Sequence, residues 1–285
     1  MNPAMATVAQ TPPKPAQNLR KLGVPRRLSA TVKLLIVAGW AAAGPNAQAQ
    51  MPLDLVRSVA DAGSRLVAER DNYTYTQRFR FTEFRGGLPA GRYEEVRDIT
   101  FTGTGERQEL HRTKPIMQLQ RMRLTDEDFR DLRDVNPFVL TRETLRFYKV
   151  GYKGIEQVDG LDCHVLAVRP KQVLYGQRFF DGLLWVGVEH GQVVRAGGRP
   201  VPQIHRIEDS NLFPAFITDY QPIDGKHWFP VRTEGDDILP FPTGNQRVKV
   251  LIEYSDYKRF SATSTVTFGK APGEASSEPE SAPAP

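Results

Sequence analysis

Residues 73–84 alternate between aromatic and polar side chains, and this alternation constrains the fold more than any other feature of the chain. Tyr73, Tyr75, Phe79 and Phe81 fall on one side of an extended strand, while threonines and arginines fall on the other. One apolar and one polar face is typical of a strand in an antiparallel sheet that packs one side on a core and leaves the other in water. We therefore expect a long, half-buried strand here.

Further strands with the same period follow along the chain, separated by turn residues. Asp159 and Gly160 join the segments 146–158 and 161–169, and the pair Asp-Gly favours the positive φ angles of a tight hairpin turn. The other expected strands are 92–101, 106–112, 179–188, 192–196, 216–221, 228–233, 247–260 and 262–268. Short strands joined by hairpins predict one large, meandering antiparallel sheet.

Two segments are predicted to be helical. Residues 53–70 carry apolar side chains at the spacing of one helix face. Residues 125–134 begin with Thr125 and three acidic side chains, which cap a helix and suit its positive end. The acidic run lacks the alternating ligands and the central glycine of a calcium loop, so capping is preferred over metal binding. The predicted fold class is therefore α+β and mostly β.

Residues 1–49 have the order of charged and apolar residues that directs export. Basic residues precede an apolar run at 34–43, and an Ala-Gln-Ala sequence ending at Ala49 suits a signal peptidase. The run is shorter than the roughly 20 residues that span a bilayer as a helix, so cleavage near Ala49 is favoured over an uncleaved anchor. Arg26 and Arg27 leave the twin-arginine route open beside the general secretory route. We expect a periplasmic protein.

The predicted organisation has three parts: a leader at 1–49, a β domain at 50–269 and a tail at 270–285. The tail consists mainly of Pro, Ala, Ser and Glu and has no large apolar side chain. Such a segment cannot bury enough surface to offset the entropy of ordering it, so we predict that it is disordered.

The net charge of +5 is misleading, because it comes from the leader. The chain has 38 Lys and Arg against 33 Asp and Glu, but six of the basic residues and none of the acidic ones lie in residues 1–49. Without the leader the chain is close to neutral. A nucleic-acid-binding protein needs a positive field to displace counterions, so we expect no nucleic-acid partner.

No catalytic motif stands out. The sequence has no nucleophile elbow, phosphate-binding loop, dinucleotide-binding glycine pattern or His-Glu-x-x-His pair. The single cysteine, Cys163, lies in an alternating strand pattern typical of a small buried side chain. Asp219, Asp236 and Asp237 are the candidates for an acid and base pair in a hydrolase. Asp236 and Asp237 lie between a glycine and two prolines, which favours a solvated loop. We expect no enzymatic activity, no cofactor and no metal site.

Several segments of the second half resemble the outer-membrane lipoprotein-sorting protein superfamily. These are Val158 to Leu166, Arg169 to Lys171, Gly182 to Val186 and Ile223 to Pro230. The superfamily includes the periplasmic lipoprotein carrier and regulators of envelope-stress anti-sigma factors, and the resemblance covers roughly residues 51–268. The motifs are turns and core aromatics, so they indicate fold rather than activity.

The resemblance implies a strongly curved antiparallel sheet, a half-barrel, with an N-terminal helix and a short helix covering its concave face. Carriers of the superfamily hold lipid chains in that cavity. Arg78 and Arg80 are the candidates for the carrier's lid-closing arginine, although they lie on the strand face opposite the aromatics. The chain is longer than a typical carrier near residues 102–145 and in its acidic tail.

The leading hypothesis is a non-enzymatic binding protein that holds lipid, acyl chains or a lipoprotein. Its ligand would contact the aromatic side chains of the concave face, with the helix at 53–70 covering part of it. The predicted lining residues are Tyr73, Tyr75, Phe79, Phe81, Trp185, Phe216 and Trp228. In the alternative, this face is ordinary core, and a sheet edge or a loop binds an envelope membrane protein in a regulatory or interaction role.

Overall fold

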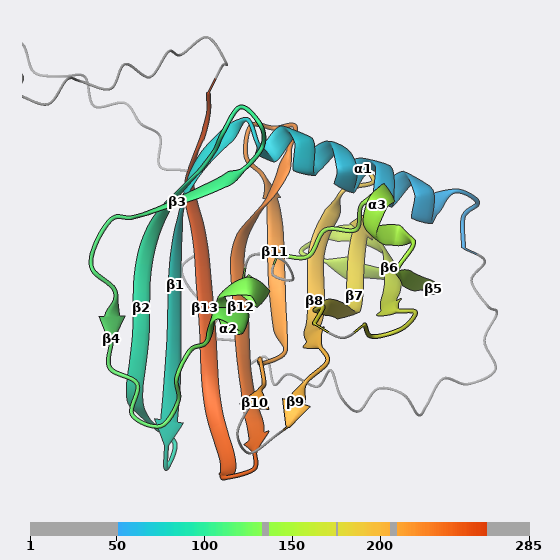
Figure 1. Ribbon diagram of the computed structural model, residues 1–285. Helices are drawn as coiled ribbons and strands as arrows, with labels where there is room; N and C mark the ends of the chain where they lie inside the picture. Colours follow the sequence, from blue (N-terminus) through green and yellow to red (C-terminus); the bar gives the residue numbers. More distant parts are fainter. Residues whose placement is uncertain (1–50, 133–136, 175, 206–209, 261–285) are drawn as a thin grey trace, which may run out of the picture. The chain divides into compact units, whose positions relative to one another are not determined.

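The computed structural model describes residues 51–132, 137–174, 176–205 and 210–260, and one antiparallel sheet dominates them (Figure 1). The sheet has eleven strands in the order β3-β2-β1-β13-β12-β11-β8-β7-β6-β5, and β4 pairs with β2 outside this path. The sheet is not closed, so β3 and β5 are its edges. The predicted mostly-β, antiparallel fold class is confirmed. The leader, the tail and the expected strand at 262–268 lie outside the described residues.

Two runs of hairpins make up the sheet. The first consists of β1 (Tyr73–Arg85), β2 (Leu88–Phe101), β3 (Arg107–His111) and β4 (Ile116–Met117). The second consists of β5 (Tyr148–Val158), β6 (Leu161–Pro170), β7 (Phe179–Gly187), β8 (Val193–Val201), β11 (Phe216–Pro222), β12 (Trp228–Phe241) and β13 (Gly244–Arg259). The first and last strands, β1 and β13, pair and join the two runs, with Phe79 opposite Ile252. Two short strands, β9 (Ile204–His205) and β10 (Ser210–Asn211), pair separately.

Local turn chemistry explains the hairpin between β5 and β6. Asp159 and Gly160 have φ angles of 50° and 85°, as expected of the tight turn between β5 and β6.

The predicted loop at Asp236 and Asp237 is wrong, because both residues lie inside β12. The carboxylate of Asp236 accepts hydrogen bonds from Arg247 on β13 at 2.9 and 2.8 Å. This cross-strand ion pair allows an acidic pair within a strand.

Helix α1 (Leu55–Arg70) confirms the predicted N-terminal helix and runs across one end of the strands (Figure 1). It buries Val59 and Ala60. At Gly63 a Cβ atom would lie 2.1 Å from the backbone oxygen of Leu140, so only glycine allows this approach. No helix among the described residues is long and apolar enough to cross a membrane.

Two short helices are held by side-chain caps. In α2 (Asp126–Arg130) the Thr125 hydroxyl accepts the Asp128 N–H at 3.3 Å, and the Asp128 carboxylate accepts the Thr125 N–H at 2.7 Å. This capping box confirms the interpretation of the acidic run as a helix start. Helix α3 (Arg142–Leu145) was not predicted, although the reciprocal hydrogen bonds of Thr141 and Thr144 form the same kind of cap.

The chain between β4 and β5 must pass from the first part of the sheet to its far edge, and it crosses one face on the way. We call residues 118–132 and 137–147 the crossing segment, and the face they cover the inner face. Helix α2 lies in front of the sheet in Figure 1, and its Phe129 meets Tyr93 of β2 with 5.8 Å between ring centroids. Apolar side chains of the segment join the main core: Leu119, Met122, Leu124, Phe129, Leu132, Phe138, Leu140, Leu145 and Phe147.

Candidate binding site at the inner face of the sheet

The aromatic side chains of β1 lie in the interior. Tyr75, Phe79 and Phe81 belong to the main hydrophobic cluster with Phe216 of β11. Each of these four side chains is between 0% and 6% exposed. Tyr73, also buried, lies 4.9 Å from Phe229, measured between ring centroids. The sequence alternation therefore identified a buried face of the strand.

The two tryptophans grouped with these rings lie differently. Trp185 packs with Cys163 and Val194 in a second, smaller cluster, and its Nε1 donates to Glu156 at 2.8 Å. Its neighbours on β7 belong to the main cluster, and successive strand residues point to opposite faces. The structure thus places Trp185 on the face opposite the aromatic interior. Trp228 packs against both clusters and stacks on His190 at 4.5 Å.

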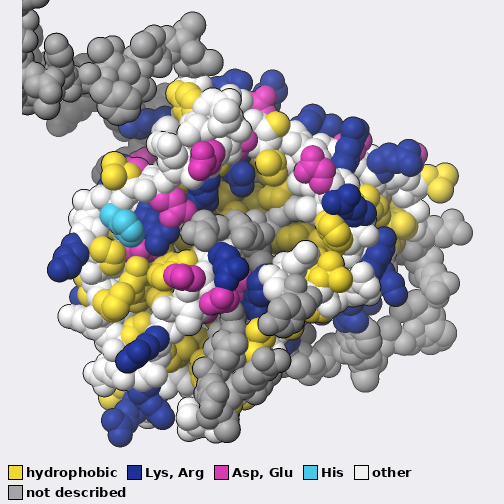
Figure 2. All heavy atoms as spheres, viewed as in Figure 1, with side chains coloured by type: hydrophobic (Ala, Val, Ile, Leu, Met, Phe, Trp, Pro, Cys, Tyr) yellow, Lys and Arg dark blue, Asp and Glu magenta, His cyan; other side chains and the backbone are white. Residues whose placement is uncertain are grey.

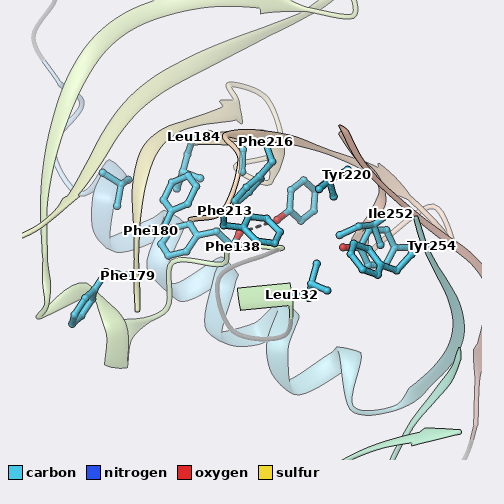
Figure 3. Packing of buried hydrophobic residues seen from close by; sticks show 14 of the residues in the cluster. Leu132, Phe138, Phe179, Phe180, Leu184, Phe213, Phe216, Tyr220, Ile252 and Tyr254 are labelled. Atoms are coloured by element: carbon cyan, nitrogen blue, oxygen red, sulfur yellow. Dashed lines mark hydrogen bonds between the residues drawn. The ribbon is translucent and has the colours of Figure 1, made fainter. Parts of the chain in front are cut away.

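The crossing segment fills the interior beside these rings. Phe138 stacks on Phe180 of β7 with 4.2 Å between ring centroids, and it meets Tyr148 edge-on at 5.5 Å. The Tyr220 hydroxyl donates to the backbone oxygen of Phe138 at 2.8 Å (Figure 3). A ligand chain that reached the rings of β1 and β11 would have to displace the side chains of this segment.

Polar anchors fix the crossing segment to the sheet. The Glu83 carboxylate on β1 is fully buried and accepts the backbone N–H groups of Gln120, at 2.5 Å, and of Met122, at 3.1 Å. Asp131, also fully buried, pairs with Arg178 at 2.6 Å. Buried carboxylates are stable only when such partners satisfy them, so these contacts hold the segment in one place.

The sequence motif at 223–230 also has a structural role. The Asp224 carboxylate accepts the backbone N–H groups of Lys226 and His227, and it accepts the Tyr73 hydroxyl at 2.6 Å. Burial opposes ionisation of Asp224, but these hydrogen bonds outweigh it and hold its pKa well below the usual range. Burial and the bond to Asp224 raise the pKa of Tyr73 to about 12. The motif ties the start of β1 to the turn before β12.

The remaining polar candidates are engaged in separate pairs. Arg78 and Arg80 bind Glu94 of β2, at 3.0 and 3.4 Å, on the outer face. Asp219 accepts a hydrogen bond from Arg195 at 2.6 Å, and Asp237 accepts the Ala215 N–H at 3.2 Å. The three aspartates considered for a hydrolase therefore have three different partners. The described residues hold no cluster of three His, Cys, Asp or Glu side chains suited to a metal ion.

A second polar region lies where β2, β3 and α2 meet. The Arg97 guanidinium pairs with the buried Glu95 at 2.6 Å and with Glu109. A pocket of about 440 Å³ next to it is lined by Arg97, Asp126, Phe129 and Arg130. Because internal carboxylates already bind Arg97, and Arg130 pairs with Glu127, the pocket offers little unpaired positive charge.

An open pocket of about 490 Å³ lies between α1, α3 and β5, and we call it the α1–β5 pocket. Its apolar walls are Val56, Leu145, Tyr148 and Val150, and its basic side chains are Arg142, Arg146 and Lys171. In Figure 2, blue and yellow side chains lie next to each other on the right, where Figure 1 places α3 and β5. Its volume falls within the range of small-molecule sites, about 300 to 1,000 Å³.

Tyr148 connects this pocket to the interior. Tyr148 lines the pocket, and its ring meets those of Phe138 and Phe179 with 5.5 and 6.2 Å between centroids. The Tyr148 hydroxyl accepts the Phe180 N–H at 3.1 Å, and burial raises its pKa. The sequence did not indicate this pocket, because its side chains come from three elements and its basic residues are ordinary surface residues in the sequence.

Comparisons with known proteins concern the fold. No family model and no curated protein matches the chain. A solved DUF1329 family protein from Desulfovibrio piger shares 15% identity with a TM-score of 0.37, covering 74% of this chain and 95% of that one. A LolA superfamily protein from Nitrosomonas europaea shares 16% identity with a TM-score of 0.35, covering 72% and 94%.

An outer membrane lipoprotein-sorting protein domain from Vibrio parahaemolyticus shares 10% identity with a TM-score of 0.35, covering 73% of this chain and 95% of that one. The solved structures similar to this chain therefore include proteins of the superfamily that its sequence motifs indicated. At these identities the likeness concerns the fold alone, so the function proposed below rests on the residues of this chain.

Proposed function

We propose that this chain is an exported, non-enzymatic binding protein that holds the apolar chain of a lipid or of an acylated protein. The observation that carries the proposal is the α1–β5 pocket, which is open, has four apolar wall residues and lies next to the aromatic interior. The leader at 1–49, with its cleavage signal near Ala49, supports a periplasmic location.

Burial of apolar surface supplies the binding energy. Each methylene group that leaves water contributes about 0.8 kcal/mol. The first part of a chain would lie against Val56, Leu145 and Val150, with the Tyr148 ring at the inner end of the pocket. This arrangement needs no movement of the crossing segment.

Longer chains would reach the predicted lining residues on β1 and β11 only if the crossing segment moved. The apolar side chains of the segment would then be exchanged for a ligand of similar character, which changes the free energy little. The main cost would be the loss of anchors such as the Glu83 hydrogen bonds, since hydrogen bonds to charged groups contribute roughly 1.5 to 3 kcal/mol each. We therefore propose the pocket as the first site of contact and the aromatic interior as its deeper extension.

Binding of a fluorescent fatty acid, competed by unlabelled chains, tests the proposal. The substitution Val150→Trp should fill the pocket and weaken binding at least tenfold, while Val188→Trp, at an exposed position in the turn after β7, should leave it unchanged. Native mass spectrometry of the exported protein would reveal bound lipid directly. A protein that carries no lipid and binds no chain in either assay would contradict the proposal.

The alternative function is an envelope interaction module that binds a membrane protein. The observation favouring it is that β5 is an edge of the sheet, with Ile155 57% exposed. A lysine, Lys153, and a bulge between Tyr152 and Gly154 make the edge a poor template for another strand, so we rank this function second. Pull-down of a stoichiometric protein partner from envelope extract, without lipid, would favour it.

A further inference from the structure

We propose that the basic side of the α1–β5 pocket binds the anionic headgroup of an amphiphile, either a phosphate or a carboxylate. This inference rests on the function proposed above and names the class of ligand. Three of the residues that line the pocket are basic, and the four others are apolar. A ligand that matches both parts has a charged head and an apolar chain.

The three basic side chains converge from two separate elements. Arg142 begins α3, and Arg146 follows four residues later at its C-cap, so both lie on the same side of this helical turn. Lys171 comes from the chain just after β6. Its backbone N–H donates to the Phe147 oxygen at 2.7 Å, and its Nζ donates to the Arg146 oxygen at 2.8 Å. These bonds fix the lysine beside the end of α3.

Among the described residues, two of the three basic side chains form no ion pair. Arg142 pairs with Asp61 of α1, and its backbone N–H donates to Ser64. Neither Arg146 nor Lys171 forms an ion pair within the described ranges, whereas Arg146 stacks over the Phe147 ring at 4.7 Å. Lys171 uses one of its three N–H donors on a carbonyl, so two remain for a ligand. Glu143, the acidic residue of α3, follows Arg142 directly and thus points to another side of the turn.

Charge complementarity distinguishes this pocket from the others. At the pocket lined by Arg97, the guanidinium is already neutralised by Glu95 and Glu109, so an anion gains little there. At the α1–β5 pocket the exposed Arg146 and Lys171 lie next to half-buried apolar walls, so an anionic head would be attracted to them while its chain contacts the walls. Arginine also binds phosphate and carboxylate oxygens in pairs.

The test compares ligands that share a twelve-carbon chain and differ only in the head. The probes are dodecyl phosphate, dodecanoate, dodecanol and dodecyltrimethylammonium, measured by displacement of the fluorescent fatty acid at low and moderate salt. We expect the two anions to bind at least tenfold more tightly than dodecanol, and the cation more weakly than dodecanol. The difference should shrink as salt rises. The tighter of the two anions identifies the preferred head.

A double variant, R146Q and K171Q, should lose at least tenfold in affinity for the anions and keep the affinity of the native protein for dodecanol. The matched control, R85Q with K226Q, removes two exposed positive charges outside the pocket and should behave as the native protein. Circular dichroism and thermal unfolding establish that both variants fold.

The outcomes separate this inference from the function on which it rests. If dodecanol binds as tightly as the anions, or if the double variant retains the preference, the headgroup site is refuted and the binding function stands. If none of the four chains binds, both are refuted. Binding of inorganic phosphate alone with the affinity of dodecyl phosphate would mark a site for simple anions and would also contradict the proposal.

Discussion

The two ends of residues 137–147, the second part of the crossing segment, differ in how their apolar side chains are used. Around Phe138 the segment packs against β7 and β11, and the sheet satisfies its polar groups, as in the Tyr220 hydrogen bond. Around Leu145 the segment lies at the rim of the α1–β5 pocket, and the basic residues that line the pocket with it are exposed. Similar apolar residues therefore form closed core at one end and the wall of an open pocket at the other. What differs is whether the sheet supplies partners for the neighbouring polar groups.

Truncation of the closed end should have the largest effect. The substitution Phe138→Ala removes a ring that is 5% exposed and stacked on Phe180, and a buried Phe→Ala change typically costs about 3 to 5 kcal/mol. Urea denaturation should show this loss in the free energy of unfolding. The cavity should also take up dodecanol, so that the ligand restores part of the lost stability. A loss below 1 kcal/mol would show that the interior is not closed here.

The helix that precedes the closed end should respond to pH. Burial raises the pKa of Asp128 to about 6, against the opposing hydrogen bonds from Thr125. Because the ordinary value is 3.8, Asp128 favours the folded state fully below about pH 4, and this contribution is lost as the pH rises through 6. The loss amounts to roughly 2 to 3 kcal/mol.

The variant Asp128→Asn isolates this contribution. The stability of the native protein relative to the variant should fall between pH 4 and 7, measured by urea denaturation at each pH. Asp126→Asn, at an exposed position of the same helix, is the control and should run parallel to the native protein. A constant difference between native protein and Asp128→Asn would show that Asp128 is not buried in solution.

Truncation of the open end should have the smallest effect on stability. Leu145 is only half-buried at the pocket rim, so Leu145→Ala should cost about 1 kcal/mol in the free energy of unfolding. The same change should weaken binding of dodecanoate severalfold, since it removes a wall of the pocket. If Leu145→Ala lowered the free energy of unfolding as much as Phe138→Ala and left binding unchanged, the contrast between a closed and an open end would be contradicted.

Local sequence signals predicted local structure well. The alternation that starts at Tyr73 indicated a buried strand face, Asp159 and Gly160 indicated a hairpin, and Thr125 indicated a helix start. Each of these depends on residues a few positions apart, whose backbone preferences are independent of the rest of the chain. Asp236 was misplaced because its partner, Arg247, lies on another strand.

Long-range arrangement could not be predicted in this way. The pairing of β1 with β13 joins residues about 170 positions apart, such as Phe79 and Ile252, and no local pattern encodes it. The crossing segment is apolar enough for a core, but its sequence does not reveal which face it covers. The α1–β5 pocket depends on both arrangements, because Lys171 meets α3 only after the segment has crossed the sheet.

A crystal structure of the protein with dodecyl phosphate tests the central claim most directly. We expect the chain to lie against Leu145, Tyr148 and Val150, the phosphate to contact Arg146 and Lys171, and Phe138 to remain stacked on Phe180. Electron density for the ligand at another surface, with this pocket empty, would contradict the assignment of the pocket as the binding site.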